Sequence, residues 1–264
     1  MSGRTQNHRG RFYDADGNKY PSVTTILSCV SKPALTAWSA NVERAMVIEA
    51  AGDFYSDLKN KKISKLAFLT QLTERIGKKK ESQKLLEKAG EIGTQAHKMI
   101  EWILRSQLCQ DVGASPVIGP EAQIAVSSWQ NWREEVNLKP ISVESVVVSH
   151  KYQYAGTMDY LCAEVNGVET LCDWKTGKRV YYEAHIQNAA YRVAIREMGI
   201  ADPKQGLILR LPKTKEEPGF EAVPARDEQP CFEVFLACKK LWQDMQEQDK
   251  WLKAQDEKEE EVRV

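Results

Sequence analysis

The sequence predicts an α/β protein in which a helical first third precedes a β-sheet. The first observation is the clean apolar stripe of residues 82–106, which repeats at helical spacing. The second is residues 141–149, whose β-branched side chains predict a strand. The third is a pair of apolar runs on either side of Asn166-Gly167, a strong hairpin signal. With 264 residues, the chain can bury the core of one moderate domain, or of a core with a helical subdomain.

The first third contains several start signals for helices. Residues 11–20 predict a small hairpin, and Ser22 predicts a short capped helix after it. Pro33 starts a helix that runs to about residue 51. Ser64 predicts a third helix, and its apolar residues form the expected buried face: Leu66, Leu69, Leu72 and Ile76.

The order of the expected elements divides the chain into three regions. Residues 1–136 hold the N-terminal hairpin and the helices, including the helix of residues 82–106. Residues 137–254 hold the sheet and a long closing helix. Residues 255–264 form an acidic tail that we expect to be disordered.

Composition points to a soluble protein of a reducing compartment. The formal net charge is zero, which argues against a large non-specific basic surface. Six cysteines are scattered without a CxxC pair, so a zinc or iron-sulfur site is not expected. No secretory signal or long apolar run is present, and we therefore expect a cytoplasmic protein without a membrane contact.

The predicted hairpin carries the most informative charges. Asp159 lies on its first strand, and Asp173 and Lys175 lie on its second strand. A two-residue loop at Asn166-Gly167 would place the two aspartates on opposite faces of the sheet. A three-residue loop of residues 165–167, with a left-handed glycine as a bulge, or an equivalent bulge in the hairpin, would place them directly opposite each other. The register therefore decides whether the carboxylates meet.

Opposed aspartates suit a divalent cation. Like charges directly opposite each other destabilise a sheet, and a cation between them reverses that effect. Carboxylate oxygens, with further positions filled by water, suit Mg²⁺ or Mn²⁺. Lys175 could then orient a metal-activated water or stabilise charge on a phosphate. The alternative is a solvated hairpin edge that carries ordinary charges.

Five other residues are candidates on weaker grounds. His97 and Glu101 lie on one flank of an apolar helix stripe, where a histidine is also an ordinary structural residue. Glu144 shares a strand face with valines, so its carboxylate needs a partner, which could be the metal site. Gln187 and Tyr191 are neighbours on a helix, and a packed tyrosine ring with a local hydrogen bond would explain them equally well.

The order of these motifs resembles the PD-(D/E)xK nuclease superfamily. Glu144 comes first, GTMD follows and ends at Asp159, DWKTG comes next, and Gln187 and Tyr191 lie on the following helix. This resemblance implies a restriction-endonuclease-like core, in which helices flank a central mixed β-sheet, with an N-terminal helical subdomain.

Two further motifs resemble the RecB-type exonuclease branch of that superfamily. Gly93 and His97, within GTQAHKMIE, match its G-x-x-x-H pattern. The segment YPSVTTIL and a helix with Trp38 are similar to the mitochondrial genome maintenance exonuclease and to phage-encoded relatives.

The resemblance also implies roles for individual residues. His97, Asp159 and Asp173 would bind a metal ion, with the Trp174 carbonyl as a further ligand. Lys175 would be the catalytic lysine, and it would act with both aspartates.

The remaining matches have less regular roles. Glu144 matches a variable acidic position of the catalytic set, and Met158 replaces the proline that precedes the first aspartate in many members. Gln187 and Tyr191 would support the site and contact nucleic acid, and we group Glu101 with them. The family's iron-sulfur members carry one upstream and three C-terminal cysteines. This chain does not supply that set, and no cluster is expected: Cys29, Cys231 and Cys238.

The sequence thus favours a Mg²⁺- or Mn²⁺-dependent DNA exonuclease that hydrolyses phosphodiester bonds from DNA ends. Recombination, repair or phage DNA processing would be its context, in the cytoplasm of a bacterial or phage-infected cell. Its partner would be DNA, as a single strand or at an end. A structure-specific endonuclease with the same residues, or a non-catalytic DNA-binding protein, are the alternatives.

Overall fold

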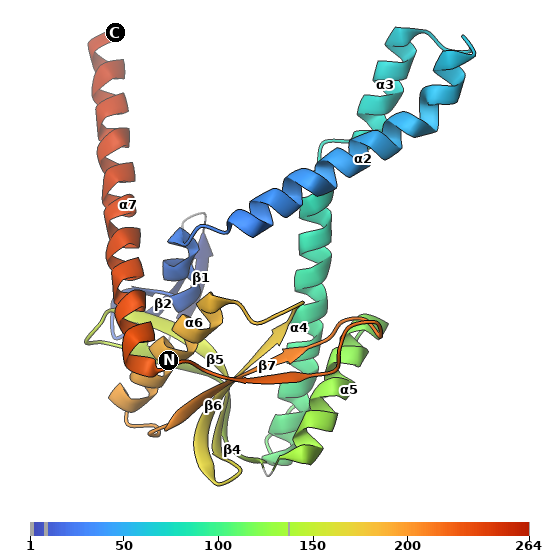
Figure 1. Ribbon diagram of the computed structural model, residues 1–264. Helices are drawn as coiled ribbons and strands as arrows, with labels where there is room; N and C mark the ends of the chain where they lie inside the picture. Colours follow the sequence, from blue (N-terminus) through green and yellow to red (C-terminus); the bar gives the residue numbers. More distant parts are fainter. Residues whose placement is uncertain (1–2, 8–9, 137, 264) are drawn as a thin grey trace. The chain divides into compact units, whose positions relative to one another are not determined.

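The computed structural model describes residues 3–7, 10–136 and 138–263, and it has the mixed α/β architecture that the sequence predicts (Figure 1). The chain forms two compact units. The smaller unit holds residues 31–92, and the larger holds residues 1–30 and 93–264.

The boundary between the units falls within helix α4, which spans Glu81–Gln107. The part from Gly93 onward, with His97, belongs to the unit that contains the large sheet. The sequence predicts a boundary near residue 136 instead, because a continuous helical pattern does not show which of its turns pack on a sheet.

The smaller unit contains two helices and the first turns of α4. Helix α2 spans Pro33–Lys59 and is longer than predicted, and α3 spans Lys65–Ile76. Ser64 caps α3 as predicted, since its Oγ accepts a hydrogen bond from the Ala67 N–H at 3.1 Å.

The predicted buried face of α3 is wrong. Leu66 is 75% exposed and Leu69 is 56% exposed, and α3 has no buried residue in the described chain. Helix α3 packs against α2, and a two-helix hairpin is too thin to enclose an apolar stripe. The apolar stripe predicted the helix correctly, but it did not predict that the apolar face would be exposed.

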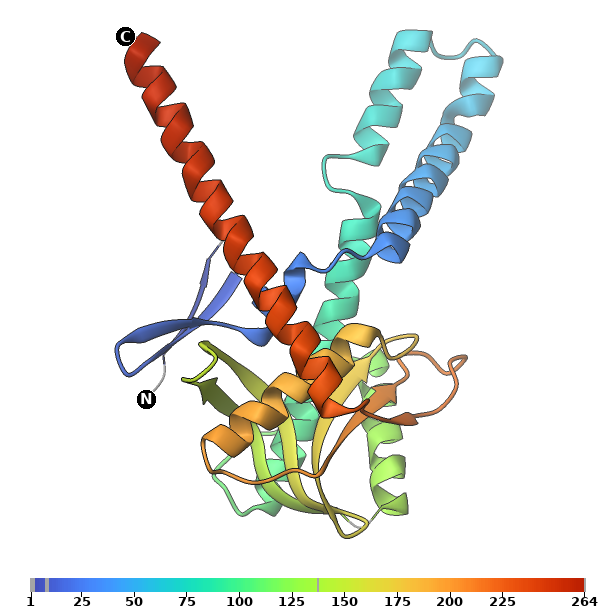
Figure 2. The same ribbon diagram turned by 60° about the vertical axis from the view of Figure 1, so that its left-hand side comes forward.

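The larger unit is built on a five-stranded mixed sheet (Figures 1 and 2). Strands β6 and β7 are parallel, and the other neighbours are antiparallel. The expected mixed sheet is therefore confirmed. The strands, in their order across the sheet, are β4 (Leu138–Ser149), β5 (Tyr154–Val165), β6 (Val168–Thr176), β7 (Gln205–Leu211) and β8 (Glu221–Pro224).

Helices cover both sides of this sheet (Figure 2). Helix α6 (Tyr182–Glu197) connects β6 to β7 and shares a core cluster with the sheet and with the start of α7. Helix α5 (Pro120–Glu135) carries Trp129 and Trp132, whose rings meet the Trp174 ring edge to face. The sheet thus lies between two apolar layers.

A three-stranded antiparallel sheet precedes α4 and packs on the large sheet. The predicted hairpin is confirmed, and an additional strand extends it. The Tyr13 hydroxyl lies 2.8 Å from Thr157 Oγ1 of β5, and Ser22 forms an isolated bridge with Ala155. Ser22 also caps the short helix that follows, as predicted. These elements are β1 (Gly3–Asn7), β2 (Gly10–Ala15), β3 (Asn18–Pro21), α1 (Val23–Ile26) and the 3₁₀ helix η1 (Leu27–Cys29).

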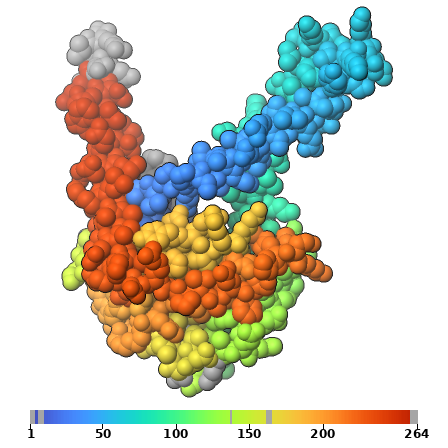
Figure 3. Space-filling model, viewed as in Figure 1, coloured from blue at the N-terminus to red at the C-terminus, as the bar shows by residue number. Residues whose placement is uncertain are grey.

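Helix α7 spans Glu228–Arg263, so the expectation of a disordered tail is wrong for residues 255–263. Residue 264 lies outside the described residues. Glu, Lys, Gln and Ala are strong helix formers, and they continue the helix where the apolar pattern ends. Figure 3 shows α7 as a column that extends well past the sheet. Among the described residues, no helix is both long and apolar enough to cross a membrane.

Gly206 allows helix α6 to lie close to the sheet. A Cβ atom at this position would lie 1.9 Å from Asn188 Oδ1 of α6 and 2.8 Å from the Cβ of Ala225. Asn188 is buried, and its Nδ2 donates a hydrogen bond to the Leu171 carbonyl of β6 at 3.2 Å. The missing side chain therefore permits a buried helix-to-sheet hydrogen bond.

We predict that Gly206→Ala lowers the free energy of unfolding by about 1–3 kcal/mol, because the methyl group overpacks this contact. Urea unfolding, followed by circular dichroism, measures the effect. Gly219→Ala is the matched control, since a Cβ there meets no described atom within 4 Å. Equal stability of the two variants would contradict the assigned role of Gly206.

Candidate metal centre

The β5–β6 hairpin turns through two residues. Val165 pairs with Val168, and Asn166 and Gly167 have φ values of 51° and 86°. Both values are left-handed, as a type I′ turn requires. The three-residue loop that we considered for convergence of the aspartates is therefore wrong, because Asn-Gly suits the tighter turn.

A bulge farther along the hairpin changes the register. The pairing shifts between Cys162 and Val165, and beyond the shift Tyr160 pairs with Cys172. One further step along each strand brings Asp159 opposite Asp173. The alternative expectation, an equivalent bulge in the hairpin, is therefore confirmed.

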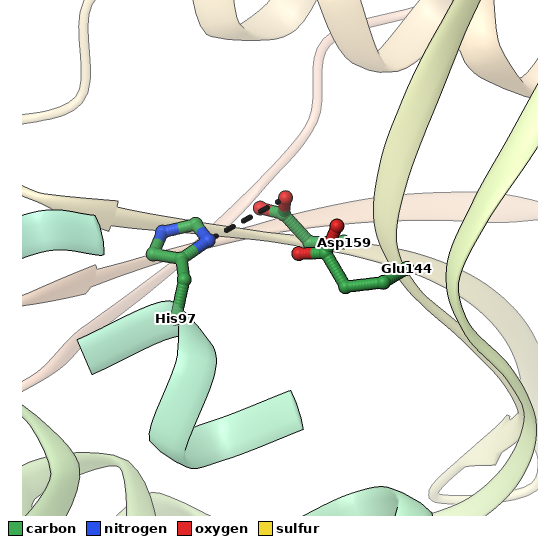
Figure 4. Close-up of side chains that lie close together, drawn as sticks. All are labelled: His97, Glu144 and Asp159. Atoms are coloured by element: carbon green, nitrogen blue, oxygen red, sulfur yellow. Dashed lines mark ion pairs between the residues drawn. The ribbon is translucent and has the colours of Figure 1, made fainter. Parts of the chain in front are cut away.

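Asp159 makes contacts with two other elements. Its Oδ2 accepts a hydrogen bond from the Trp174 N–H of β6 at 2.9 Å. Its Oδ1 lies 3.6 Å from His97 Nδ1, and Figure 4 shows the imidazole of α4 directed at this carboxylate. One carboxylate therefore links the helix to two strands.

Glu144 of β4 completes a group of potential metal ligands. Val143 pairs with Tyr160 and Ser145 with Met158, which puts Glu144 across from Asp159. One ligand atom from each of three residues lies within 4.8 Å of the others: His97, Glu144 and Asp159. Figure 4 shows the two carboxylates side by side.

The backbone at Glu144 is unusual for a strand. Its φ is 46°, in the left-handed region that a residue with a Cβ rarely adopts. Such a conformation costs on the order of 1–3 kcal/mol and is common at functional sites. Burial raises the pKa of Glu144 to about 7, and the Asp159 carboxylate acts in the same direction. Glu144 thus combines a strained backbone with a poorly solvated carboxyl group.

Asp173 and Lys175 form the second part of the centre. Lys175 Nζ lies 2.5 Å from Asp173 Oδ2, and the Asp173 side chain is only 3% exposed. Apart from this ion pair, Oδ2 has no hydrogen bond of good geometry with a described residue. Asp173 is therefore a buried carboxylate with unused acceptor capacity.

The two aspartates respond differently to their surroundings. At Asp159, His97 and Lys175 outweigh burial and lower the pKa below its ordinary value. At Asp173, burial outweighs Lys175, and repulsion by Asp159 adds to it, so the pKa is raised. Burial lowers the pKa of His97 and Lys175, and the neighbouring aspartates raise it. The aspartates together have the larger effect, so the pKa of each base is raised.

Helix α4 is fixed by its buried stripe and by a close glycine contact. Ala96, Ile100 and Leu104 recur at helical spacing and are fully buried. A Cβ at Gly93 would lie 2.7 Å from Thr176 Oγ1, at the end of β6. Gly93 thus allows α4 to approach β6 one turn before His97.

Glu101 lies one turn after His97 and pairs with Arg105, whose Nε is 2.8 Å from Glu101 Oε1. Its charge contributes to the raised pKa of Glu144, which places it close to the centre. The ion pair of Glu101 with Arg105 lies within α4 itself.

Gln187 and Tyr191 of α6 contact each other beside the hairpin. Gln187 Nε2 donates to the Tyr191 hydroxyl at 3.2 Å. The Tyr191 ring packs on Gly156 of β5, where a Cβ would lie 2.5 Å from its Cε1 atom. The glycine of GTMD therefore makes room for this tyrosine, three residues before Asp159.

The arrangement fits a divalent cation. Two carboxylates and one imidazole approach one another, and the adjacent Asp173 is buried and short of donors. The group of ligand atoms that lie close together includes Glu144, whereas the family resemblance implied Asp173 and the Trp174 carbonyl as ligands. The signal for Glu144 was a carboxylate on an apolar strand face.

No curated protein matches the sequence. Among solved structures, the crystal structure of SSO0001 is similar over 58% of this chain and 74% of that chain, with 10% sequence identity and a TM-score of 0.29.

A family model matches residues 120–259, which is more than half of the chain. The match includes the strands with Glu144, Asp159 and Asp173, and helix α6, whereas His97 lies before it. The mixed sheet flanked by helices is the restriction-endonuclease-like fold that this family implies. The chain belongs to the PD-(D/E)XK nuclease superfamily.

Proposed function

We propose that this protein is a Mg²⁺- or Mn²⁺-dependent DNA exonuclease, which hydrolyses phosphodiester bonds from DNA ends. The observation that carries the proposal is the group formed by His97, Glu144 and Asp159, next to the Asp173–Lys175 ion pair. Membership of a nuclease superfamily makes DNA the natural substrate. The exonuclease assignment rests on the sequence motifs of the RecB-type branch, with processing of DNA in recombination, repair or phage replication as its context.

His97, Glu144 and Asp159 would hold the cation, with Asp173 and the Trp174 carbonyl as further ligands. A bound Mg²⁺ or Mn²⁺ lowers the pKa of water and neutralises charge on a phosphate. The oxygen ligands of this set suit Mg²⁺ and Mn²⁺, and His97 adds one imidazole nitrogen to them.

Lys175 would supply the positive charge that acts on the phosphate or on the attacking water. Its side chain is 34% exposed, so the ammonium group can reach a phosphate oxygen or orient a water while it holds Asp173. Its raised pKa keeps it protonated, which suits charge stabilisation rather than proton abstraction. Gln187 and Tyr191 support the hairpin from α6, and Glu101 adds negative charge from α4.

We predict that Asp173→Asn and Lys175→Met each reduce metal-dependent hydrolysis at least a hundredfold, because each removes one member of the buried pair. End-labelled linear DNA, single- and double-stranded, with Mg²⁺ or Mn²⁺ and with a chelator, measures this. Circular single-stranded DNA should remain intact if the enzyme needs an end.

The matched control is the exposed Asp202–Lys204 ion pair, altered to Asn and Met in the same way. Those changes should leave activity within twofold, because the pair is solvated and distant in sequence from the motifs. Full activity of Asp173→Asn or Lys175→Met would refute the mechanism. Cutting of the circle by wild-type protein would favour the endonuclease alternative.

We predict that His97→Ala weakens Mn²⁺ binding at least tenfold, because it removes one donor from the group. Isothermal titration of the metal-free protein measures the affinity. His150→Ala is the control, since His150 Nε2 also lies 3.6 Å from a carboxylate, that of Asp16, outside the centre. An unchanged titration for His97→Ala would return this histidine to a structural role.

We predict that Mn²⁺ affinity rises between pH 6 and pH 8. Without metal, Glu144 has a pKa of about 7, and the pKa values of Asp173 and His97 are also raised. These groups bind protons near pH 6, and a cation must displace them, so lower pH weakens binding. Titrations in buffers of different ionisation enthalpy count the released protons, and Glu144→Gln should release fewer. An affinity independent of pH would contradict the assignment of these donors.

A further inference from the structure

The segment that joins β6 to α6 exposes two aromatic rings. Tyr181 is 52% exposed and Tyr182 is 44% exposed, at the N-terminus of α6. In Figure 3 the start of α6, drawn in gold, lies at the surface. Large aromatic side chains are usually buried in a core, so two consecutive exposed rings indicate a candidate binding surface.

Each ring carries an arginine on one face. The Arg179 guanidinium carbon lies 5.1 Å from the Tyr181 ring centroid, and that of Arg226 lies 5.3 Å from the Tyr182 centroid. The Arg226 backbone N–H also donates to His185 Nδ1 at 3.3 Å, which ties Arg226 to the first turn of α6. Cation–π contact holds the rings in place and leaves the rest of each ring exposed.

The charge of this segment suits a polyanion. Lys178, Arg179 and Arg226 are cationic, and the nearby acids in sequence are Glu183, Asp227 and Glu228. Glu228 is already paired with Arg192 and Arg196 of α6. Basic groups interleaved with exposed aromatic rings are typical of surfaces that bind single-stranded nucleic acid, where bases stack and phosphates contact the cations. A duplex keeps its bases stacked internally and has no free base faces to offer.

The segment is directly connected to the candidate centre. It begins after Thr176, whose Oγ1 abuts Gly93 one turn before His97. It also follows Lys175 on the same strand and leads into the helix of Gln187. Tyr181 follows Lys175 by six residues, so the chain holds these rings within about 20 Å of that lysine.

We propose that Tyr181 and Tyr182, with Arg179 and Arg226, form a stacking surface for the bases of single-stranded DNA that enters the metal centre. The proposal rests on the proposed nuclease function and names its substrate as a single strand or a frayed end. The rings give affinity without base preference, because every base has a stacking face.

The experiment measures binding of a fluorescein-labelled 20-nucleotide oligothymidine, and of a blunt duplex of the same length, in the presence of a chelator. The Tyr181→Ala/Tyr182→Ala double variant should bind the single strand at least tenfold more weakly and the duplex less than threefold more weakly. Tyr181→Phe/Tyr182→Phe should retain wild-type affinity, because phenylalanine keeps the ring. Trp251→Ala removes a comparably exposed ring, 57% exposed, from α7 and should have no effect.

Arg179→Gln should behave differently from the alanine variant. It should reduce the salt dependence of single-strand binding, whereas loss of the rings should leave that dependence unchanged. Unchanged single-strand affinity of the alanine double variant would overturn the proposal. Equal weakening for single strand and duplex would also overturn it, because the surface would then contact phosphates only.

Hydrolysis by the same wild-type protein with Mg²⁺ or Mn²⁺ separates the two proposals. Selective loss of single-strand binding without any wild-type hydrolysis would support the stacking surface and refute the nuclease function. Normal hydrolysis together with unaffected binding in the alanine variant would refute the stacking surface alone.

Discussion

The opposition of Asp159 and Asp173 on adjoining strands is the constraint on which the rest of the centre depends. Two carboxylates this close resist joint ionisation, and burial increases the cost. The fold supplies two cationic groups from different elements: His97 contacts Asp159 from α4, and Lys175 contacts Asp173 from its own strand. The result is a lowered pKa at Asp159 and a raised one at Asp173. Asp159 therefore stays charged, as its proposed role of metal ligand requires.

This arrangement requires unusually close packing around the hairpin, and glycines provide it. Gly93 brings α4 against Thr176 at the end of β6, which puts His97 within reach of Asp159. Gly156 of β5 leaves room for the Tyr191 ring of α6. A side chain at either glycine would move a helix relative to the strands. The motif glycines thus help to position the charged side chains, although they carry no charge themselves.

Local sequence signals predicted most elements of the fold, and they failed where surroundings or register decide the outcome. Ser64 predicted a helix start correctly, but nothing in α3 showed that Leu66 would remain exposed. Asn166-Gly167 predicted the hairpin, but the bulge between Cys162 and Val165 has no local signature, and the loop that we considered was wrong. The pairing of the two aspartates therefore follows from the strand interior and not from the turn.

Glu144 shows most clearly what the sequence could not contain. A carboxylate among valines indicated a need for a partner, but the left-handed backbone at φ 46° depends on pairing with β5. The centre then holds three carboxylates against two bases, so it keeps an excess of negative charge when all are ionised. Strain and repulsion both lower the stability of the metal-free fold. A cation that binds only the folded chain relieves the repulsion and stabilises the fold by mass action. The repulsion that weakens the metal-free centre therefore strengthens its preference for a cation.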